Sequence, residues 1–477
     1  MSDSQMAEAR NFCDIDYIST RGGAPDLGFR DVVLTGLAQD GGLYVPRYVP
    51  KLNPDDFTRF KDAPYTDVAF EVLSAFMGHI MPDEVLKGMI DETYKAFHHK
   101  DVSPITRLTD QMWVMEQFHG PTLAFKDFAL QLLGRIFDYI LNERDERITI
   151  VGATSGDTGS AAIEGCRGRD NMDIFILYPH GRVSEVQRRQ MTTVHDKNVH
   201  NIALEGSFDD CQDLVKAMFN DAEFRKDISM SAVNSINWAR IMAQVVYYVY
   251  ASSRVDGKVS FFVPTGNFGN IYAGYLARQM GAPIDRLIVA TNRNDILARF
   301  FETGEMSIKG VEPSLSPSMD IQISSNFERL YFDALGRDAD ALAENMQRFR
   351  KEGRISVDEN VLSKMKEVFA AYRTSDEDTK AITKRIYDEF DYVIDPHTAT
   401  GIKAVYDFMD ENLDYDGTCI ALSTAHPAKF PDAVTSAIGV CPDLPPWLSD
   451  LHDREERFEV LPNDLETVKD YIRKLAP

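Results

Sequence analysis

The order of apolar and polar residues along this chain changes after residue 105, and the change predicts its architecture. From there on, short runs rich in Val, Ile, Leu and Phe are separated by longer stretches of helical period. The runs are apolar at consecutive positions, which is typical of parallel strands covered by helices on both faces. We expect strands at 112–116, 148–154, 174–179, 201–206, 259–266, 286–291, 392–396 and 419–424. An α/β layered fold follows, in which ligands bind beyond the carboxyl ends of the strands.

The chain before that change is expected to form a separate N-terminal unit. Its segments 66–79 and 83–97 have the period of amphipathic helices. Farther along, residues 336–390 are rich in charge and poor in small-residue turns, which predicts a solvated helical insertion. The expected domains are residues 1–105, 106–245 and 246–477, the last of which contains the insertion.

Lys126 stands in the sequence Q-F-H-G-P-T-L-A-F-K-D-F-A-L, between Phe125 and Phe128. A turn at Gly120 and a helix opened by Pro121-Thr122 would place this lysine near the start of a helix. Partial burial lowers a lysine pKa, and a neutral amine is what a Schiff base with an aldehyde cofactor requires. Taken alone, the stretch also fits an ordinary lysine whose stem lies along apolar surface.

The segment I-V-G-A-T-S-G-D-T-G-S-A-A (150–162) reads as a strand, a hydroxyl-rich glycine turn and a helix. Backbone N–H groups at the helix start, with the hydroxyls of Thr154, Ser155 and Thr158, suit a carboxylate or a phosphate. A tight structural turn is the alternative. D-T-G-S also matches the aspartic-protease signature, but such proteases need a second carboxylate in a like setting. The chain has no second D-T-G or D-S-G, and a parallel α/β pattern is wrong for that fold.

The segment V-P-T-G-N-F-G-N-I-Y-A-G (263–274) is a second glycine loop between a strand and a helix. Its consecutive N–H groups can surround an anion, and its glycines allow a close approach of the backbone. It has neither the lysine and hydroxyl of a P-loop nor the G-x-G-x-x-G spacing of a dinucleotide site. A compact phosphate is therefore a better candidate ligand than a dinucleotide.

Arg240 lies in an apolar helical stretch (231–250), on the same face as Asn237 and Gln244. An arginine on a buried helix needs an anionic partner. That partner is either a ligand or a carboxylate of the protein, and the pattern leaves both open.

The segment A-L-S-T-A-H-P-A-K-F (421–430) places Thr424 at the end of a strand. His426 follows beside a proline, and His397 lies in a similar setting. A histidine beside a proline is more often a packed turn residue than a catalytic base, so we expect a packing role for both.

Composition limits the classes of function. The chain has 477 residues and a formal net charge of −24, which disfavours nucleic acid and anionic membrane as partners. Its five cysteines are scattered, with no C-x-x-C, so we expect free thiols and no zinc or other metal site. The first residues have no signal pattern and no apolar run is long enough to span a bilayer, so a cytoplasmic location is expected.

Seven segments in this order resemble one family: S-T-R-G, L-A-Q-D-G-G-L-Y-V-P, G-P-T-L-A-F-K-D-F, T-S-G-D-T-G, N-S-I-N, P-T-G-N-F-G-N and T-A-H-P-A-K-F. The resemblance is to the threonine synthases, pyridoxal-phosphate enzymes of fold type II in the tryptophan-synthase-β-like group, in their longer bacterial and fungal form. It covers nearly the whole chain. The fold that it implies has two parallel-sheet α/β domains and an N-terminal domain.

The resemblance also implies roles for particular residues. Lys126 matches the Schiff-base lysine, and Thr424 matches the hydroxyl partner of the pyridine nitrogen. The loop around the cofactor phosphate is matched by Gly266, Asn267, Phe268, Gly269 and Asn270. The positions that receive the substrate phosphate are matched by Asn234, Ser235 and Arg240, and those that receive the substrate carboxylate by Thr154, Ser155 and Thr158.

Asp157 departs from related shorter enzymes, which carry Asn at this position. An Asn can donate a hydrogen bond to the phenolate oxygen of the cofactor and an ionised Asp cannot, so the role of Asp157 stays open.

The activity implied is the conversion of O-phospho-L-homoserine and water into L-threonine and phosphate. Two alternatives remain: a phospholyase or dehydratase that gives a keto acid, and a relative that binds the cofactor without catalysis. The sequence does not give the oligomeric state or the effectors.

Overall fold

Two parallel sheets organise the computed structural model, which describes residues 14–231 and 234–476. The larger sheet has six strands in the order β13-β10-β9-β14-β4-β3, and only β3 is antiparallel to its neighbour. Its members are β3 (Ile105–Arg107), β4 (Met112–Glu116), β9 (Val259–Pro264), β10 (Ile284–Thr291), β13 (Phe369–Arg373) and β14 (Thr418–Ser423). The smaller sheet has five parallel strands in the order β15-β7-β6-β5-β8. Its members are β5 (Ile148–Ala153), β6 (Met172–Pro179), β7 (Val199–Glu205), β8 (Met230–Ser231) and β15 (Glu459–Pro462).

Helices cover both faces of each sheet, as the continuous apolar runs predict. Around the five-stranded sheet these are α5 (Lys126–Arg144), α6 (Asp157–Cys166) and α7 (Glu185–Thr192) on one side, and α8 (Phe208–Asn220), α9 (Ala222–Asp227) and α19 (Leu465–Leu475) on the other. Around the six-stranded sheet these are α10 (Trp238–Ser252), α11 (Gly269–Met280) and α12 (Ile296–Thr303) on one side, and α16 (Asp376–Phe390) and α17 (Pro396–Glu411) on the other. In β6, for example, Ile174 and Ile176 pack toward α5 and α6, whereas Phe175 and Leu177 pack toward α8.

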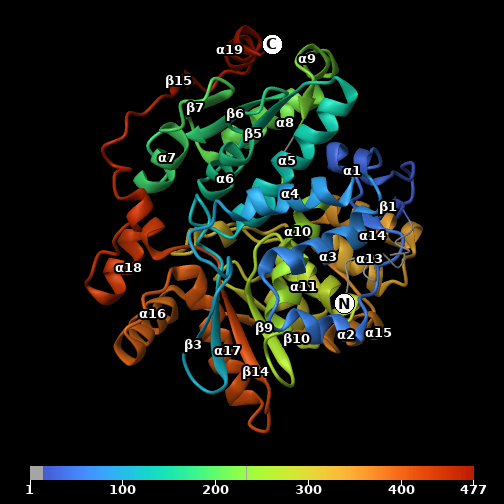
Figure 1. Ribbon diagram of the computed structural model, residues 1–477, viewed down its shortest axis with the longest axis vertical. Helices are drawn as coiled ribbons and strands as arrows, with labels where there is room; N and C mark the ends of the chain where they lie inside the picture. The colour runs from blue at the N-terminus through green and yellow to red at the C-terminus, as the bar shows by residue number, and fades with distance from the viewer. Residues whose placement is uncertain (1–13, 232–233, 477) are drawn as a thin grey trace.

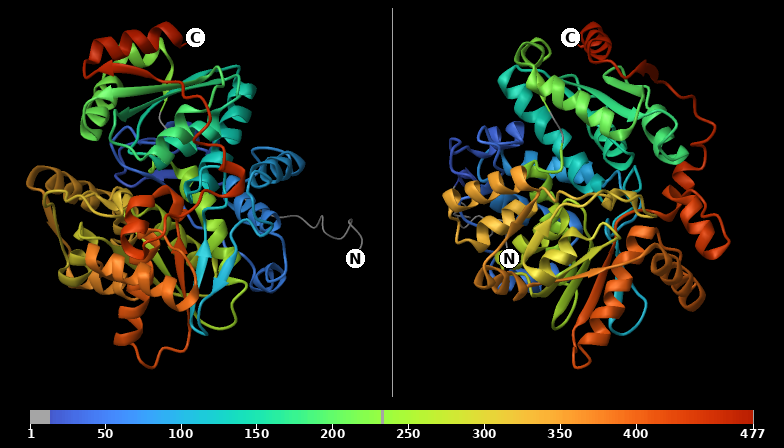
Figure 2. Two further views of the ribbon diagram at one scale, coloured as in Figure 1. Left: turned by 90° about the vertical axis from the view of Figure 1, so that its left-hand side faces the viewer. Right: turned by 180° about the vertical axis from the view of Figure 1, so that it is seen from behind.

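The remaining elements lie around this frame. They are β1 (Tyr17–Ser19), α1 (Phe29–Thr35), β2 (Tyr44–Pro46), α2 (Pro54–Phe60), α3 (Tyr65–Met77), α4 (Asp83–Tyr94), β11 (Glu305–Ser307), α13 (Phe327–Ala334), α14 (Ala339–Glu352), β12 (Arg354–Ser356), α15 (Glu359–Lys366) and α18 (Pro431–Ile438). The five-stranded sheet occupies the upper part of Figure 1 and the six-stranded sheet the lower part. After α18 the chain returns to the upper part, where it adds β15 and α19 (Figure 2, left). None of the helices in the described ranges is long and apolar enough to cross a membrane.

Several predicted elements differ from the observed ones. The expected strand at 392–396 is wrong, because Asp395 accepts hydrogen bonds from the backbone of His397 and Thr398 and so caps α17. The helix that carries Lys126 does not open at Pro121, because Leu123 has a left-handed φ of 63°.

The sheets also group some segments differently from the expected domains. β3 and β4 pair within the six-stranded sheet although they follow the N-terminal unit in sequence, and β15 joins the five-stranded sheet. The charge-rich region at 336–390 contains three helices, but also β13, which is the edge strand of the six-stranded sheet. The first thirteen residues of the expected N-terminal unit, including Cys13, lie outside the described residues.

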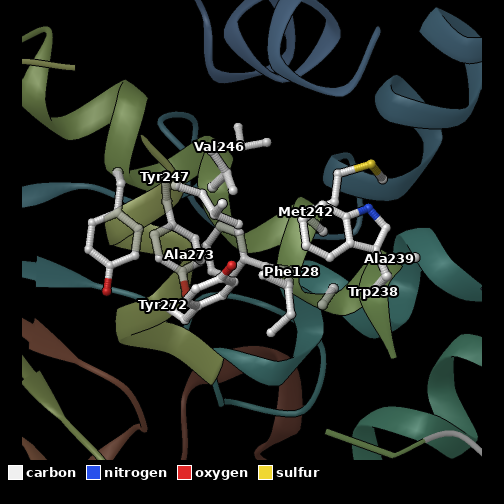
Figure 3. Packing of buried hydrophobic residues seen from close by; sticks show 14 of the residues in the cluster. Phe128, Trp238, Ala239, Met242, Val246, Tyr247, Tyr272 and Ala273 are labelled. Atoms are coloured by element: carbon white, nitrogen blue, oxygen red, sulfur yellow. The ribbon is translucent and has the colours of Figure 1, made fainter. Parts of the chain in front are cut away.

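Helix α10 lies at the centre of the packing. All of its residues are buried, and it contacts α3, α5 and α11. Figure 3 shows Trp238, Met242 and Tyr247 of this helix together with Phe128 of α5 and Tyr272 of α11. The rings of Phe128 and Tyr247 meet edge to face at 5.4 Å. A helix that is apolar on all sides is expected in such a position.

Helices α5 and α6 pack side by side with their backbones in close contact. A Cβ atom at Gly134 would lie 1.9 Å from the carbonyl oxygen of Gly165, and one at Gly165 would lie 2.4 Å from that of Leu130. Both glycines follow the N-terminal residues of their helices, Lys126 and Asp157, by about two turns. The close packing therefore sets the distance between these two helix starts.

Gly134→Ala is expected to lower the free energy of unfolding by roughly 1–3 kcal/mol, because backbone atoms must move to admit the methyl group. Gly88→Ala is the matched control, since Gly88 is an exposed helical glycine with no atom near its absent Cβ. That control should be neutral or stabilising by up to about 1 kcal/mol. Urea unfolding of both variants measures the difference, and equal effects would contradict the role of Gly134.

Candidate active site

Lys126 is the first residue of α5, and its amine is almost enclosed. The side chain is 11% exposed, and Nζ lies 5.0 Å from the centre of the Phe125 ring. Nζ donates a hydrogen bond to Oδ2 of Asp157 at 3.2 Å. Burial lowers the pKa of Lys126, and this effect outweighs the opposing attraction of the Asp157 charge. Of the two flanking aromatic residues, Phe125 lies against the amine, whereas the ring of Phe128 packs against Tyr247 of α10.

Thr424 lies directly after β14, against the segment that leads into Lys126. The backbone N–H of Phe125 donates to the carbonyl of Thr424 at 2.9 Å, and the N–H of His426 donates to that of Leu123 at 3.0 Å. These bonds fix the end of β14 beside the start of α5. The structure thus brings together two of the predicted site residues that lie far apart in sequence.

The glycine loop at 266–270 forms the start of α11. Phe268 has a left-handed φ of 64° and precedes the first helical residue, Gly269. The first N–H groups of a helix have no partner within it, so this start can bind an anion. Oδ1 of Asn270 accepts hydrogen bonds from Tyr247 and Tyr248, while its Nδ2 is buried and has no partner in the part of the chain that the structure describes. The loop therefore has free donors.

The T-S-G-D-T-G loop forms the start of α6, and its hydroxyl groups have different surroundings. Oγ1 of Thr154 accepts hydrogen bonds from the N–H groups of Gly156 and Gly159, so it stabilises the loop itself. Ser155 is exposed and Thr158 is half-buried. Within the described residues neither of these two hydroxyls makes a hydrogen bond, whereas Thr154 has only its hydroxyl hydrogen left to donate.

Arg240 is buried on α10 and has no anionic partner. It is 4% exposed, and its Nε and Nη1 atoms donate to no acceptor in the described residues. No carboxylate of those residues lies within salt-bridge distance of it, although its charge acts on Lys126. Burial lowers the pKa of Arg240 to about 10. The sequence left open whether Arg240 pairs with a ligand or with a carboxylate of the protein. An ion pair with a carboxylate is not found among the described residues.

Asn234 and Ser235 lie just before α10. Oδ1 of Asn234 accepts from the N–H of Ile236 at 3.3 Å, and the carbonyl of Ser235 accepts from Nδ2 of Asn326. Asn326 also donates to the carbonyl of Asn267 at 2.9 Å. This asparagine therefore joins the segment before α10 to the glycine loop before α11.

Sequence reasoning missed a second buried lysine, Lys429, and the surroundings of Asp157. Lys429 lies in a short turn (Pro427–Lys429) after β14, is fully buried, and places Nζ 3.0 Å from Oδ1 of Asp157. The same oxygen accepts from Gln187, and Oδ2 accepts from Ser318 as well as from Lys126. The only signal in the sequence was the T-A-H-P-A-K-F segment, in which the lysine follows a buried strand.

The two histidines have packing roles, as their sequence settings suggest. Nδ1 of His426 accepts from the N–H of Ala428, and burial lowers the pKa of His426 to about 4. Nδ1 of His397 lies 2.7 Å from Asp395, while its Nε2 accepts from the N–H of Ser318 at 3.2 Å. His397 therefore orients a residue that touches Asp157.

Comparison with known proteins gives the family. Three family models match: one described as threonine synthase N terminus over residues 16–94, one as pyridoxal-phosphate dependent enzyme over residues 101–424, and one as threonine synthase, C-terminal, over residues 398–472. A threonine synthase of Pseudomonas aeruginosa is 52% identical, and the match covers 96% of this chain and 97% of that protein. This chain belongs to the threonine synthase family.

Solved structures of family members agree with this assignment. A pyridoxal-phosphate-bound threonine synthase from Brucella melitensis has a TM-score of 0.94 and 51% identity, with 97% of this chain and 99% of that one covered. The yeast enzyme has a TM-score of 0.92 and 39% identity, with 96% and 98% covered. The expected fold type II architecture and the expected cofactor, pyridoxal phosphate, are thereby confirmed.

The residues of this site fit that cofactor. Lys126 provides a buried amine of lowered pKa for its aldehyde, and the start of α11 provides unpaired donors for its phosphate. Lys126, the start of α11 and Thr424 follow β4, β9 and β14, respectively. These three strands are neighbours in one sheet.

Arg240→Met is expected to raise the free energy of unfolding of the ligand-free protein by roughly 1–4 kcal/mol, because a buried unpaired charge is replaced by an apolar side chain. Arg329→Met is the matched control. Arg329 is equally buried, but it donates to the carbonyls of Tyr44 and Ile236 and to Asn326. Its loss should destabilise the fold by at least about 2 kcal/mol.

Thermal melts with and without inorganic phosphate test both variants. In protein loaded with pyridoxal phosphate, so that the loop at 266–270 is already occupied, inorganic phosphate should stabilise the wild type and Arg329→Met, but not Arg240→Met. If Arg240→Met melts far below the wild type and still responds to phosphate, Arg240 belongs to the scaffold and not to the site.

Proposed function

We propose that this chain converts O-phospho-L-homoserine and water into L-threonine and phosphate. The observation that carries the proposal is Arg240, a buried guanidinium that meets no carboxylate among the described residues and whose charge acts on the Lys126 amine. A site that holds an unpaired cation beside a cofactor lysine is suited to a substrate that brings its own anion. The family membership supports the same reaction.

The substrate phosphate is assigned to Arg240, with Asn234 and Ser235 from the segment before α10. The planar guanidinium offers two parallel donors to phosphate oxygens. The substrate carboxylate is assigned to the start of α6, where Ser155 and Thr158 offer hydroxyls and the helix offers N–H groups. Holding both ends of a flexible substrate fixes the carbon atoms between them.

Bound pyridoxal phosphate withdraws electrons from the substrate carbons, so that protons can leave them. Lys126 is the residue assigned to hold the cofactor and, once released from it, to move those protons. Its burial favours the neutral amine that both tasks need. The loop residues Gly266, Asn267, Phe268, Gly269 and Asn270 are assigned to the cofactor phosphate, and the hydroxyl of Thr424 to the ring nitrogen.

A phospholyase that releases a keto acid would use the same phosphate contacts, and a cofactor-binding relative without turnover would use the same lysine. Arg240 favours a phosphorylated substrate over both plain serine and plain threonine. The two alternatives therefore differ from the proposed function in their products and not in the residues of the site.

Incubation of the purified protein with O-phospho-L-homoserine is expected to release one phosphate for each threonine formed. Lys126→Ala should lower this rate by at least about 10²-fold, because covalent attachment and proton transfer are lost together. The control is Lys216→Ala, an exposed lysine on α8. A keto acid in place of threonine would favour the phospholyase, and a bound cofactor with no turnover would favour the non-catalytic relative.

Thr424→Val is expected to keep the cofactor bound but to lower the rate roughly five- to hundredfold and to shift the visible absorption. Valine has the shape of threonine without the hydroxyl, so packing at the end of β14 is kept. Thr424→Ser should restore most of the rate, because it restores the hydroxyl. An unchanged spectrum in Thr424→Val would remove Thr424 from the ring contact.

A further inference from the structure

The two oxygens of Asp157 face different lysines. Oδ1 lies 3.0 Å from Nζ of Lys429 and accepts a hydrogen bond from Nε2 of Gln187 at 2.8 Å. Oδ2 accepts from Nζ of Lys126 and from Oγ of Ser318, both at 3.2 Å. Asp157 is thus placed between a lysine assigned to the cofactor and a lysine with no assigned role.

The amine of Lys429 is enclosed by three acceptors. Its side chain is 0% exposed, and Nζ lies 2.6 Å from the carbonyl oxygen of Thr122, 2.9 Å from Oε1 of Gln190 and 3.0 Å from Oδ1 of Asp157. An ammonium group has three donors and no acceptor, and here it meets three acceptors. A neutral amine would turn its lone pair toward one of these oxygens. The three donors of an ammonium group at Lys429 thus match the three acceptors around it.

Lys126 differs from Lys429 although both touch the same carboxylate. Its amine makes one hydrogen bond within the described residues, the one to Asp157. Burial lowers the pKa of Lys126, the Asp157 charge raises it, and the charges of Lys429 and Arg240 lower it. Burial raises the pKa of Asp157, but the charges of Lys126 and Lys429, the hydrogen bond from Gln187 and the charge of His397 on α17 together lower it.

Asp127, the residue after Lys126, makes its hydrogen bonds to other residues than the two lysines. Its oxygens accept hydrogen bonds from the backbone and hydroxyl of Thr122 and from Gln131. Burial raises the pKa of Asp127 to about 6. Asp157 is therefore the carboxylate that faces the Lys126 amine.

We propose that Lys429 is the permanent counter-ion of Asp157 and thereby frees the Lys126 amine to lose its proton. A buried carboxylate needs a cation beside it. Without Lys429, Lys126 would be the cation in contact with Asp157, and its proton would be held there. With Lys429 in place, the carboxylate is already paired, and its Oδ2 accepts a hydrogen bond from a neutral Lys126. Lys429 is a positioning residue in this proposal, which rests on the assignment of Lys126 as the attachment lysine.

The test is the pH dependence of cofactor attachment to the full chain. The cofactor is removed, pyridoxal phosphate is added back at a series of pH values, and the attached fraction is trapped with borohydride and read from its fluorescence. For Lys429→Gln the midpoint of the attachment rate should lie roughly 1–3 pH units above that of the wild type. At neutral pH the rate should fall about tenfold for each unit. Lys429→Arg keeps the charge and should stay close to the wild-type midpoint.

Removing the carboxylate separates this role from a merely structural one. In Asp157→Asn, and in the double variant Lys429→Gln with Asp157→Asn, the midpoint should lie at or below that of the wild type. Melts show which variants fold, and if Lys429→Gln does not fold, a midpoint of Asp157→Asn above that of the wild type still overturns the proposal. Equal midpoints in wild type and Lys429→Gln, or a raised midpoint in Asp157→Asn, would overturn the proposal. Attachment that fails in the wild type would instead refute the assignment of Lys126.

Discussion

The buried carboxylate of Asp157 is the constraint on which the arrangement of this site depends. A charge with almost no access to water must be paired and hydrogen-bonded, and Asp157 meets that requirement through four separate segments. Lys126 begins α5, Gln187 lies in α7, Ser318 lies in a short turn (Pro317–Met319), and Lys429 follows β14. Helices α5 and α7 pack on the five-stranded sheet, whereas Lys429 follows β14 of the six-stranded sheet. The contacts of one carboxylate therefore join the parts of the molecule built on the two sheets.

The fold supplies the other parts of the site at the carboxyl ends of its strands. The loops after β5, β9 and β14 bring hydroxyls, backbone N–H groups and Thr424 to the region around Lys126. Helix α10 adds Arg240 from the middle of the packing, where apolar neighbours leave its charge unpaired. Substrate specificity and cofactor attachment then have different physical origins. In the proposed assignment, the first depends on the guanidinium of Arg240, and the second depends on Lys429, which pairs with Asp157 so that Lys126 can be neutral.

The strands and their loops were predictable because continuous apolar runs and glycine-rich turns depend on local sequence. Lys126 and Thr424 were located in this way, at the boundary between an apolar segment and a turn. Their roles came from the resemblance to the family and stay predictions. Lys429 was not found, because a lysine after a strand ordinarily lies on the surface. Its three acceptors come from Thr122, Gln190 and Asp157, which are far away in sequence. The pairing of β4 with β14 was missed for the same reason, because strand order depends on long-range contacts.

The assignment of different roles to the two lysines beside Asp157 is tested most directly by finding which of them carries the cofactor. The protein is loaded with pyridoxal phosphate, reduced with borohydride and cleaved, and the modified peptide is identified by mass. The account predicts that the pyridoxyl group is on Lys126, with Lys429 unmodified. A pyridoxyl group on Lys429 would contradict it, because Lys429 would then be the lysine that loses its proton.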